Sequence, residues 1–72
     1  MTLLDAELEK EYIISRINTD DSELDSFLLS LGCFEGGKIA VILRKRSFLV
    51  ISIKDGRYSI DTSLANAIEL KD

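Results

Sequence analysis

Reactive side chains are scarce in this 72-residue sequence. It contains one cysteine, Cys33, and no histidine, so it can form neither an intrachain disulfide nor the usual histidine and cysteine ligand set of a zinc site. It also lacks a Gly-x-Ser-x-Gly nucleophile motif, a glycine-rich phosphate loop and a convincing pair of carboxylates on facing elements. The sequence therefore predicts a protein that is not an enzyme, with no catalytic residue, no metal site and no cofactor.

Two features could still bind a metal ion, and each has a structural interpretation that we favour. Cys33 directly follows Gly32, and a lone cysteine beside a helix end is usually a small buried hydrophobe rather than a reactive thiol. An acidic cluster could hold a hard cation through its oxygens. The same residues also suit the start of a helix, where they cap it and complement its dipole, and their spacing is not that of a calcium-binding loop. The cluster comprises Asp20, Asp21, Glu23 and Asp25.

A short basic segment is the candidate partner-binding site. Arg44, Lys45 and Arg46 could contact an acidic partner or a nucleotide phosphate. The alternative is a solvated turn whose charges discourage pairing between sheet edges. Phe48 follows closely and is the aromatic side chain that we expect to be exposed, since an aromatic beside arginine is a common interface composition. We therefore predict that Arg44, Lys45, Arg46 and Phe48 contact a partner.

Charge is distributed unevenly along the chain. Residues 1–35 hold nine acidic against two basic residues, a formal charge of −7, whereas residues 36–72 hold seven basic against four acidic residues, a charge of +3. The net charge of −4 argues against sequence-independent binding of nucleic acid, which needs a large basic surface. The start of the sequence has no secretory signal pattern, no apolar run is long enough to span a membrane, and the single cysteine fits a reducing compartment. We expect a protein that is neither exported nor inserted in a membrane.

The elements that position these residues follow from hydrophobic periodicity and turn residues. Leu24, Phe27, Leu28 and Leu31 recur at helical spacing, which predicts a helix that buries all four in the core and ends at Gly32. Alternating apolar residues predict the strands, and Asp55-Gly56 predicts a tight hairpin turn. The expected helix covers residues 22–31, a short helical turn covers 62–66, and the expected strands cover 11–17, 38–44, 48–54, 57–60 and 67–70.

The order of these elements predicts the fold. A chain of this length can form one hydrophobic core, so residues 1–72 should make a single domain. Five short strands with tight connections are best closed into a small barrel, because closure removes edges that so small a protein cannot otherwise cover. We predict a mainly-β, SH3-like barrel of about five strands with one inserted helix.

The sequence also resembles a known family, most specifically over residues 28–39. There the family has a helix ending in Leu-Gly, two variable residues, Pro-Gly and a strand. Residues 60–70 match the family's closing pattern. The family is FeoA, small SH3-like accessory proteins of bacterial ferrous iron transport. The sequence departs from it at Glu35, where proline is usual, and in residues 44–48, where the hairpin is shorter than in many relatives.

The resemblance implies a cytoplasmic accessory protein that binds the cytoplasmic GTP-binding region of the FeoB membrane transporter and modulates Fe(II) uptake. It leaves open whether a transition metal ion is bound directly and whether the protein forms a homodimer. Related SH3-like domains also occur in metal-dependent transcriptional repressors, so the alternative function is a regulatory module that acts on a separate repressor.

Overall fold

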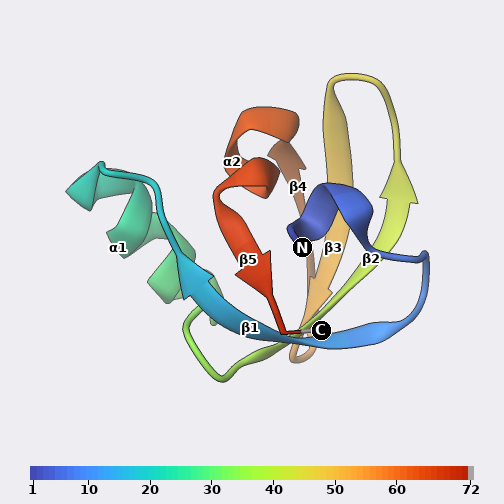
Figure 1. The fold of residues 1–72 in the computed structure, drawn as a ribbon, viewed down its shortest axis with the longest axis horizontal. Coiled ribbons are helices and arrows are strands. Elements are labelled where there is room, and N and C mark those ends of the chain that lie inside the picture. The colour runs from blue at the N-terminus through green and yellow to red at the C-terminus, as the bar shows by residue number, and fades with distance from the viewer. Residues whose placement is uncertain (72) are drawn as a thin grey trace.

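Five strands form one antiparallel sheet in the computed structural model, which describes residues 1–71. The spatial order is β4-β3-β2-β1-β5, and the sheet curls into a small barrel-like body whose two end strands are joined through a short helix, α2 (Figure 1). This confirms the predicted mainly-β fold. The strands are β1 (Glu11–Ile17), β2 (Lys38–Arg44), β3 (Phe48–Ile53), β4 (Gly56–Asp61) and β5 (Ile68–Leu70), and α2 is Thr62–Asn66.

The core lies on the concave side of this sheet and is almost entirely aliphatic. In β3, Leu49, Ile51 and Ile53 are buried and alternate with half-buried neighbours, as expected of a strand with one face in the core. The largest fully buried side chains of the other elements are Leu3, Ile14, Leu28, Ile39, Val41 and Ile68.

A bulge in β2 changes the predicted alternation. The register between β2 and β3 shifts between Val41, which pairs with Ile51, and Leu43, which pairs with Val50. Because the extra residue re-aims the strand beyond it, Leu43 is exposed although the alternation predicts it on the same side as Val41. The strand therefore leaves the core at Leu43, directly before the basic segment begins.

The α1 helix (Ser22–Leu31) has the bounds that its capping residues predict. The side chain of Asp21 accepts hydrogen bonds from the backbone N–H of Glu23 and of Leu24, which otherwise lack helical partners. At the other end Gly32 adopts φ 97°, and the N–H of Cys33 donates to the carbonyl of Leu28 at 2.9 Å. A left-handed cap of this kind favours glycine, and it ends the helix.

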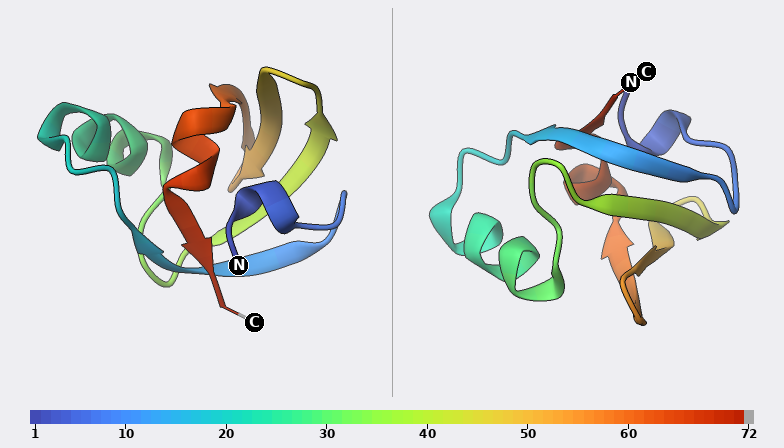
Figure 2. Two further views of the ribbon diagram at one scale, coloured as in Figure 1. Left: turned by 45° about the horizontal axis from the view of Figure 1, so that its top comes forward. Right: turned by 90° about the horizontal axis from the view of Figure 1, so that it is seen from below.

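The apolar face of α1 is only partly covered, because the helix stands to one side of the sheet (Figures 1 and 2). Leu28 is completely buried and Leu31 is half-buried, but Leu24 remains 39% exposed and Phe27 48% exposed. The prediction that all four side chains pack in the core is therefore wrong for Leu24 and Phe27. Periodicity identifies the apolar face of a helix but not the length over which another element covers it.

The β3–β4 hairpin turns one residue earlier than predicted. Its two turn residues are Lys54, with φ 54°, and Asp55, while Gly56 already belongs to β4 and pairs with Ile53. Glycine suits position 56 for a different reason: a Cβ atom there would collide with the ring of Tyr58, which folds back over it and would have to move. The glycine thus serves packing rather than a positive φ.

The N-terminal segment covers one end of the barrel. A 3₁₀ helix at Leu3–Asp5, which the sequence does not predict, follows a capping box made by Thr2 and Asp5. The N–H of Leu70 donates to the carbonyl of Met1 at 2.7 Å, so this segment lies beside β5 and covers its outer edge. Among residues 1–71, no helix combines the length and the apolar character needed to cross a membrane.

Candidate partner-binding surfaces

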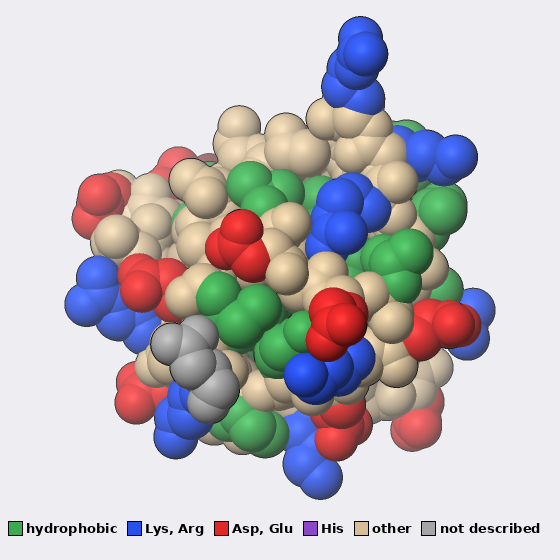
Figure 3. Space-filling view, turned by 45° about the vertical axis from the view of Figure 1, so that its right-hand side comes forward, with side chains coloured by type: hydrophobic (Ala, Val, Ile, Leu, Met, Phe, Trp, Pro, Cys, Tyr) green, Lys and Arg blue, Asp and Glu red, His purple; other side chains and the backbone are tan. Residues whose placement is uncertain are grey.

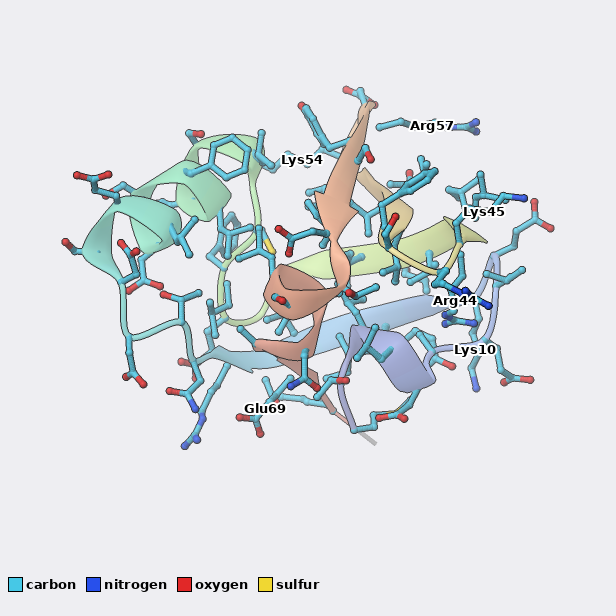
Figure 4. The ribbon with its side chains drawn as sticks, turned by 90° about the horizontal axis from the view of Figure 1, so that it is seen from above. Lys10, Arg44, Lys45, Lys54, Arg57 and Glu69 are labelled. Carbon is cyan, nitrogen blue, oxygen red and sulfur yellow. The ribbon has the colours of Figure 1, made fainter. Side chains whose placement is uncertain are left out.

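The predicted basic segment forms an exposed corner between β2 and β3. We call Lys45 and Arg46, together with Ser47, the basic corner; all three are exposed. The N–H of Lys45 donates to the carbonyl of Phe48 at 2.9 Å, which closes the corner. Figure 4 shows Lys45 at the end of the sheet remote from α1. The two cations are therefore free to approach an acidic surface.

Arg44 is held differently from its neighbours. Its guanidinium group donates to the carbonyl oxygens of Leu3, at 3.4 Å, and of Ala6. Charge-assisted bonds of this kind satisfy carbonyls at the end of the 3₁₀ helix and fasten the N-terminal segment to β2. Arg44 thus has a structural task, whether or not a partner also contacts it.

Phe48 is half-buried, so the expectation that it is the most exposed aromatic residue is wrong. It starts β3 directly before the buried Leu49, so the alternation of the strand places its side chain on the outer face of the sheet. Phe27 of α1 and Phe34, in the loop after α1, are each exposed by more than a third. Phe34 lies 5.6 Å from the Lys54 ammonium group, measured to the ring centroid.

The acidic cluster takes part in local structure. Asp21 caps α1, and a carboxylate oxygen of Asp25 accepts a hydrogen bond from the hydroxyl of Thr19. Within residues 1–71, no three cysteine, aspartate or glutamate side chains converge as metal ligands do. Cys33 is 1% exposed, and burial raises the pKa of its thiol to about 11, so it lies in the core as a neutral, unreactive side chain.

Two hollows on the α1 side of the molecule are not predicted by the sequence. The first, of about 400 Å³, lies between α1 and α2, with Leu24, Leu64 and Ala67 as apolar lining and Asp61 and Glu69 as carboxylates. The only signal for it in the sequence is the excess of apolar residues on α1, whose partner surface the sequence does not identify.

The second hollow, of about 460 Å³, lies between the C-terminal turn of α1 and the β3–β4 hairpin. Its lining includes Leu31 of α1, Gly56 and Tyr58 of β4, and the charged pair Lys54 and Asp55. The two hollows therefore lie between α1 on one side and β4 and α2 on the other.

The face of the molecule seen in Figure 3 is mixed in character. Lysine and arginine side chains stand out among acidic and hydrophobic ones, and no single sign of charge covers the face. Such a mixed surface suits recognition of a protein better than recognition of a polyphosphate backbone.

Comparison with known proteins identifies the chain along its whole length. The profile of the FeoA domain family matches residues 1–72. Among solved structures, Stenotrophomonas maltophilia FeoA complexed with zinc, an SH3-domain protein, superposes with a TM-score of 0.85 at 16% identity, over 99% of this chain and 89% of that one. The likeness confirms the predicted SH3-like fold. No curated protein sequence matches significantly.

Other solved structures contain the same fold as part of a longer chain. A manganese-dependent transcriptional repressor in complex with manganese superposes with a TM-score of 0.86 at 16% identity, over 96% of this chain. ScaR with bound Cd²⁺ gives 0.84 at 19% identity, over 99% of this chain. This chain spans only 35% and 34% of their respective lengths. At such identities the likeness concerns the fold alone.

Proposed function

The chain belongs to the FeoA family, and from this membership we propose that it is a small cytoplasmic accessory protein of ferrous iron transport. It binds the cytoplasmic GTP-binding domain of an FeoB-type transporter and thereby modulates Fe(II) uptake. The observation that carries the proposal is the match of the family along all 72 residues. The similar S. maltophilia protein is itself described as a candidate activating factor of bacterial ferrous iron transport.

The basic corner is the surface that we assign to this contact. Lys45 and Arg46 are exposed and adjacent, at the end of the molecule opposite the acidic helix α1. Separated charges of this kind orient a protein as it approaches an acidic partner and raise the association rate. Phe48 contributes the uncovered part of its ring at the border of the corner, and Arg44 holds β2 in place beneath it.

The action that this surface supports is binding alone. Binding changes a transporter only as far as the accessory protein prefers one conformation of its partner over another. We therefore expect the affinity for the GTP-binding domain to differ between its nucleotide states.

The proposal is tested by titrating the protein into the soluble GTP-binding domain of FeoB from the same organism, with and without nucleotide. We expect saturable binding that weakens about tenfold or more when Lys45→Glu and Arg46→Glu are combined, because charge reversal at an interface opposes association. Lys71→Glu, a reversal at another exposed lysine, should change the affinity little.

Two results would count against the proposal in different ways. Absence of binding in every nucleotide state overturns the transporter as partner. Equal binding by the double variant and the wild type overturns the basic corner as the contact surface. Binding to a separate metal-dependent repressor instead of the transporter domain would establish the alternative function, for which the shared fold of the repressor domains is the only support.

A further inference from the structure

The outer edge of β4 is an unfilled hydrogen-bonding surface. β4 is an end strand of the sheet, and among residues 1–71 it pairs with β3 alone. The other end strand, β5, is covered by β1 on one side and by the N-terminal segment on the other. An uncovered end strand presents its backbone N–H and C=O groups to any extended chain that approaches.

The hairpin determines which residues present these groups. Ile53 and Gly56 flank a two-residue turn and so form a hydrogen-bonded pair, after which every second residue of β4 bonds to β3. The N–H of Thr62 donates to the carbonyl of Ser47, so the same alternation of bonded and non-bonded pairs continues past the end of β4. The intervening residues, Arg57 and Ser59, therefore direct their backbone groups outward.

Helix α1 stands on the far side of this edge. The two hollows described above lie between α1 on one side and β4 with α2 on the other. Figures 2 and 4 both show α1 across an interval from β4. Leu24 lines one hollow and Leu31 lines the other, and Phe27 lies between them on the same helical stripe. A strand edge and an apolar helix face thus border one groove.

We propose that this groove binds an extended segment of a partner protein, which joins β4 as an additional strand and packs apolar side chains against α1. Peptide recognition by strand addition has these two parts: backbone hydrogen bonds to the sheet edge give affinity, and hollows for alternate side chains give specificity. The groove supplies both. The unsatisfied edge of β4 and the uncovered half of the α1 face are explained by the same occupant.

The charge around the groove specifies the segment further. The hollow at the α2 end contains two carboxylates, Asp61 and Glu69, and no lysine or arginine in its lining. Arg16 pairs with Glu69 at 3.2 Å, so Asp61 is the carboxylate that a basic residue of the segment would meet. The first turn of α1 adds Glu23 and Asp25, both exposed. A segment with an apolar residue for Leu24 and Leu64 and a basic residue beside Asp61 is therefore the complementary ligand.

A second copy of this chain fits the groove less well. An edge strand of a folded domain brings the rest of its sheet with it, and α1 stands in the space that the sheet would enter. A single extended segment needs only the strand spacing of about 4.8 Å beside β4. The inference does not depend on the transporter as partner, because it defines the ligand by its chemistry.

The test begins with random linear heptapeptides displayed on phage and selected against the full chain. Enriched peptides are then synthesised with capped ends and titrated into the purified protein. We expect alternating apolar residues with a lysine or arginine at one end. We also expect slower hydrogen exchange at the amides of Arg57 and Ser59 when peptide is bound.

Matched variants place the peptide in the groove. Ser59→Pro removes one outward N–H without breaking a bond to β3, whereas Ser59→Thr retains it. Leu24→Asp places a charge on the helix side, with Leu8→Asp as a control at another exposed leucine. We expect binding to weaken at least tenfold with Ser59→Pro and Leu24→Asp and to change less than twofold with the two controls.

A third variant examines charge. Asp61→Asn retains the N-cap of α2 because asparagine caps as well as aspartate, so only the charge is lost. In Asp61→Asn the preference for basic over neutral peptides should be weaker than in the wild type. The proposal is overturned if no selected peptide distinguishes Leu24→Asp from Leu8→Asp, or if bound peptide leaves the exchange of the Arg57 and Ser59 amides unchanged. Self-association of the free protein that Ser59→Pro abolishes would assign the edge to a second copy instead.

Discussion

Two side chains illustrate what residue type alone predicts about a role. Cys33 is a small apolar residue in the core, as the absence of any partner ligand in the sequence indicates. Arg44 is one of three consecutive cations in sequence, yet it alone bonds to the N-terminal segment. Its carbonyl partners, on Leu3 and Ala6, lie about forty residues away along the chain, and nothing in the local sequence identifies them. Long-range polar contacts of this kind need the structure.

The buried thiol makes stability depend on pH in a defined range. In the unfolded chain the Cys33 thiol has a pKa of 9.0, whereas in the folded protein its pKa is about 11. The unfolded state therefore loses the proton first, so the free energy of unfolding is unaffected below about pH 9 and falls as the pH rises toward 11. Two pKa units correspond to a loss of about 2–3 kcal/mol.

Urea denaturation at pH 8, 9, 10 and 11 measures this loss. Cys33→Val serves as the control, since it removes the thiol and keeps every other titratable group. The difference in slope between wild type and variant isolates the thiol. Parallel pH profiles for the two proteins would show that the thiol ionises as readily in the fold as outside it.

At the scale of elements, the bounds of α1 follow from the sequence because local groups determine both of its ends. Asp21 caps the first turn, and Gly32 supplies the left-handed residue after the last. The exposure of Leu24 and Phe27 does not follow from the sequence, since it depends on how far the sheet extends along the helix. The groove cannot be predicted from the sequence for the same reason, because α1 and β4, which border it, are distant in the chain.

Gly32 and Gly36 provide a matched pair that separates backbone strain from packing. Both have positive φ, 97° and 88°. A Cβ atom at position 32 would lie 3.1 Å from Cγ2 of Ile53, whereas at position 36 it would meet nothing within 4 Å. Alanine at either position costs about 1–2 kcal/mol in backbone strain. Gly32→Ala should be the more destabilising, because the side chains of Ile53 and Lys54 must also give way.

Thermal and urea unfolding of the two variants measure the two costs side by side. We expect Gly36→Ala to remain folded with a lowered unfolding midpoint. The midpoint of Gly32→Ala should be lower still. Equal losses would mean that the contact between the α1 cap and Ile53 adds nothing to the stability of the fold.

At the scale of the whole molecule, charge and topology act together. Asp20, Asp21, Glu23 and Asp25 lie at the start of α1, remote from the basic corner, whereas Asp5, Glu7 and Glu9 lie in the N-terminal segment that Arg44 fastens to β2. The uneven charge along the sequence therefore does not become two oppositely charged ends of the molecule, because the N-terminal segment folds back beside β2. Hydrophobic periodicity likewise does not predict the order of the strands in the sheet, because the pairing of β1 with β5 joins segments about fifty residues apart.

This pairing makes the last strand necessary for the fold. Ile68 and Leu70 are almost completely buried, and both lie in β5 beside β1. A chain that ends at residue 66 lacks these contacts, and we expect it to show no cooperative unfolding by circular dichroism. Leu70→Ala, which shortens one side chain, should retain a cooperative transition with about 2–5 kcal/mol less stability. A cooperative transition in the shortened chain would show that β1 to β4 fold alone.

The order of pairing also bears on how the protein is made. On the ribosome, β1 cannot complete its hydrogen bonds until β5 follows, so the sheet stays unfinished until β5 has been made. Contacts between distant segments also slow folding after release. For that interval the apolar strands β2 and β3 can pair with each other and with β1 and β4, and the acidic residues of the first third keep the chain dispersed by charge.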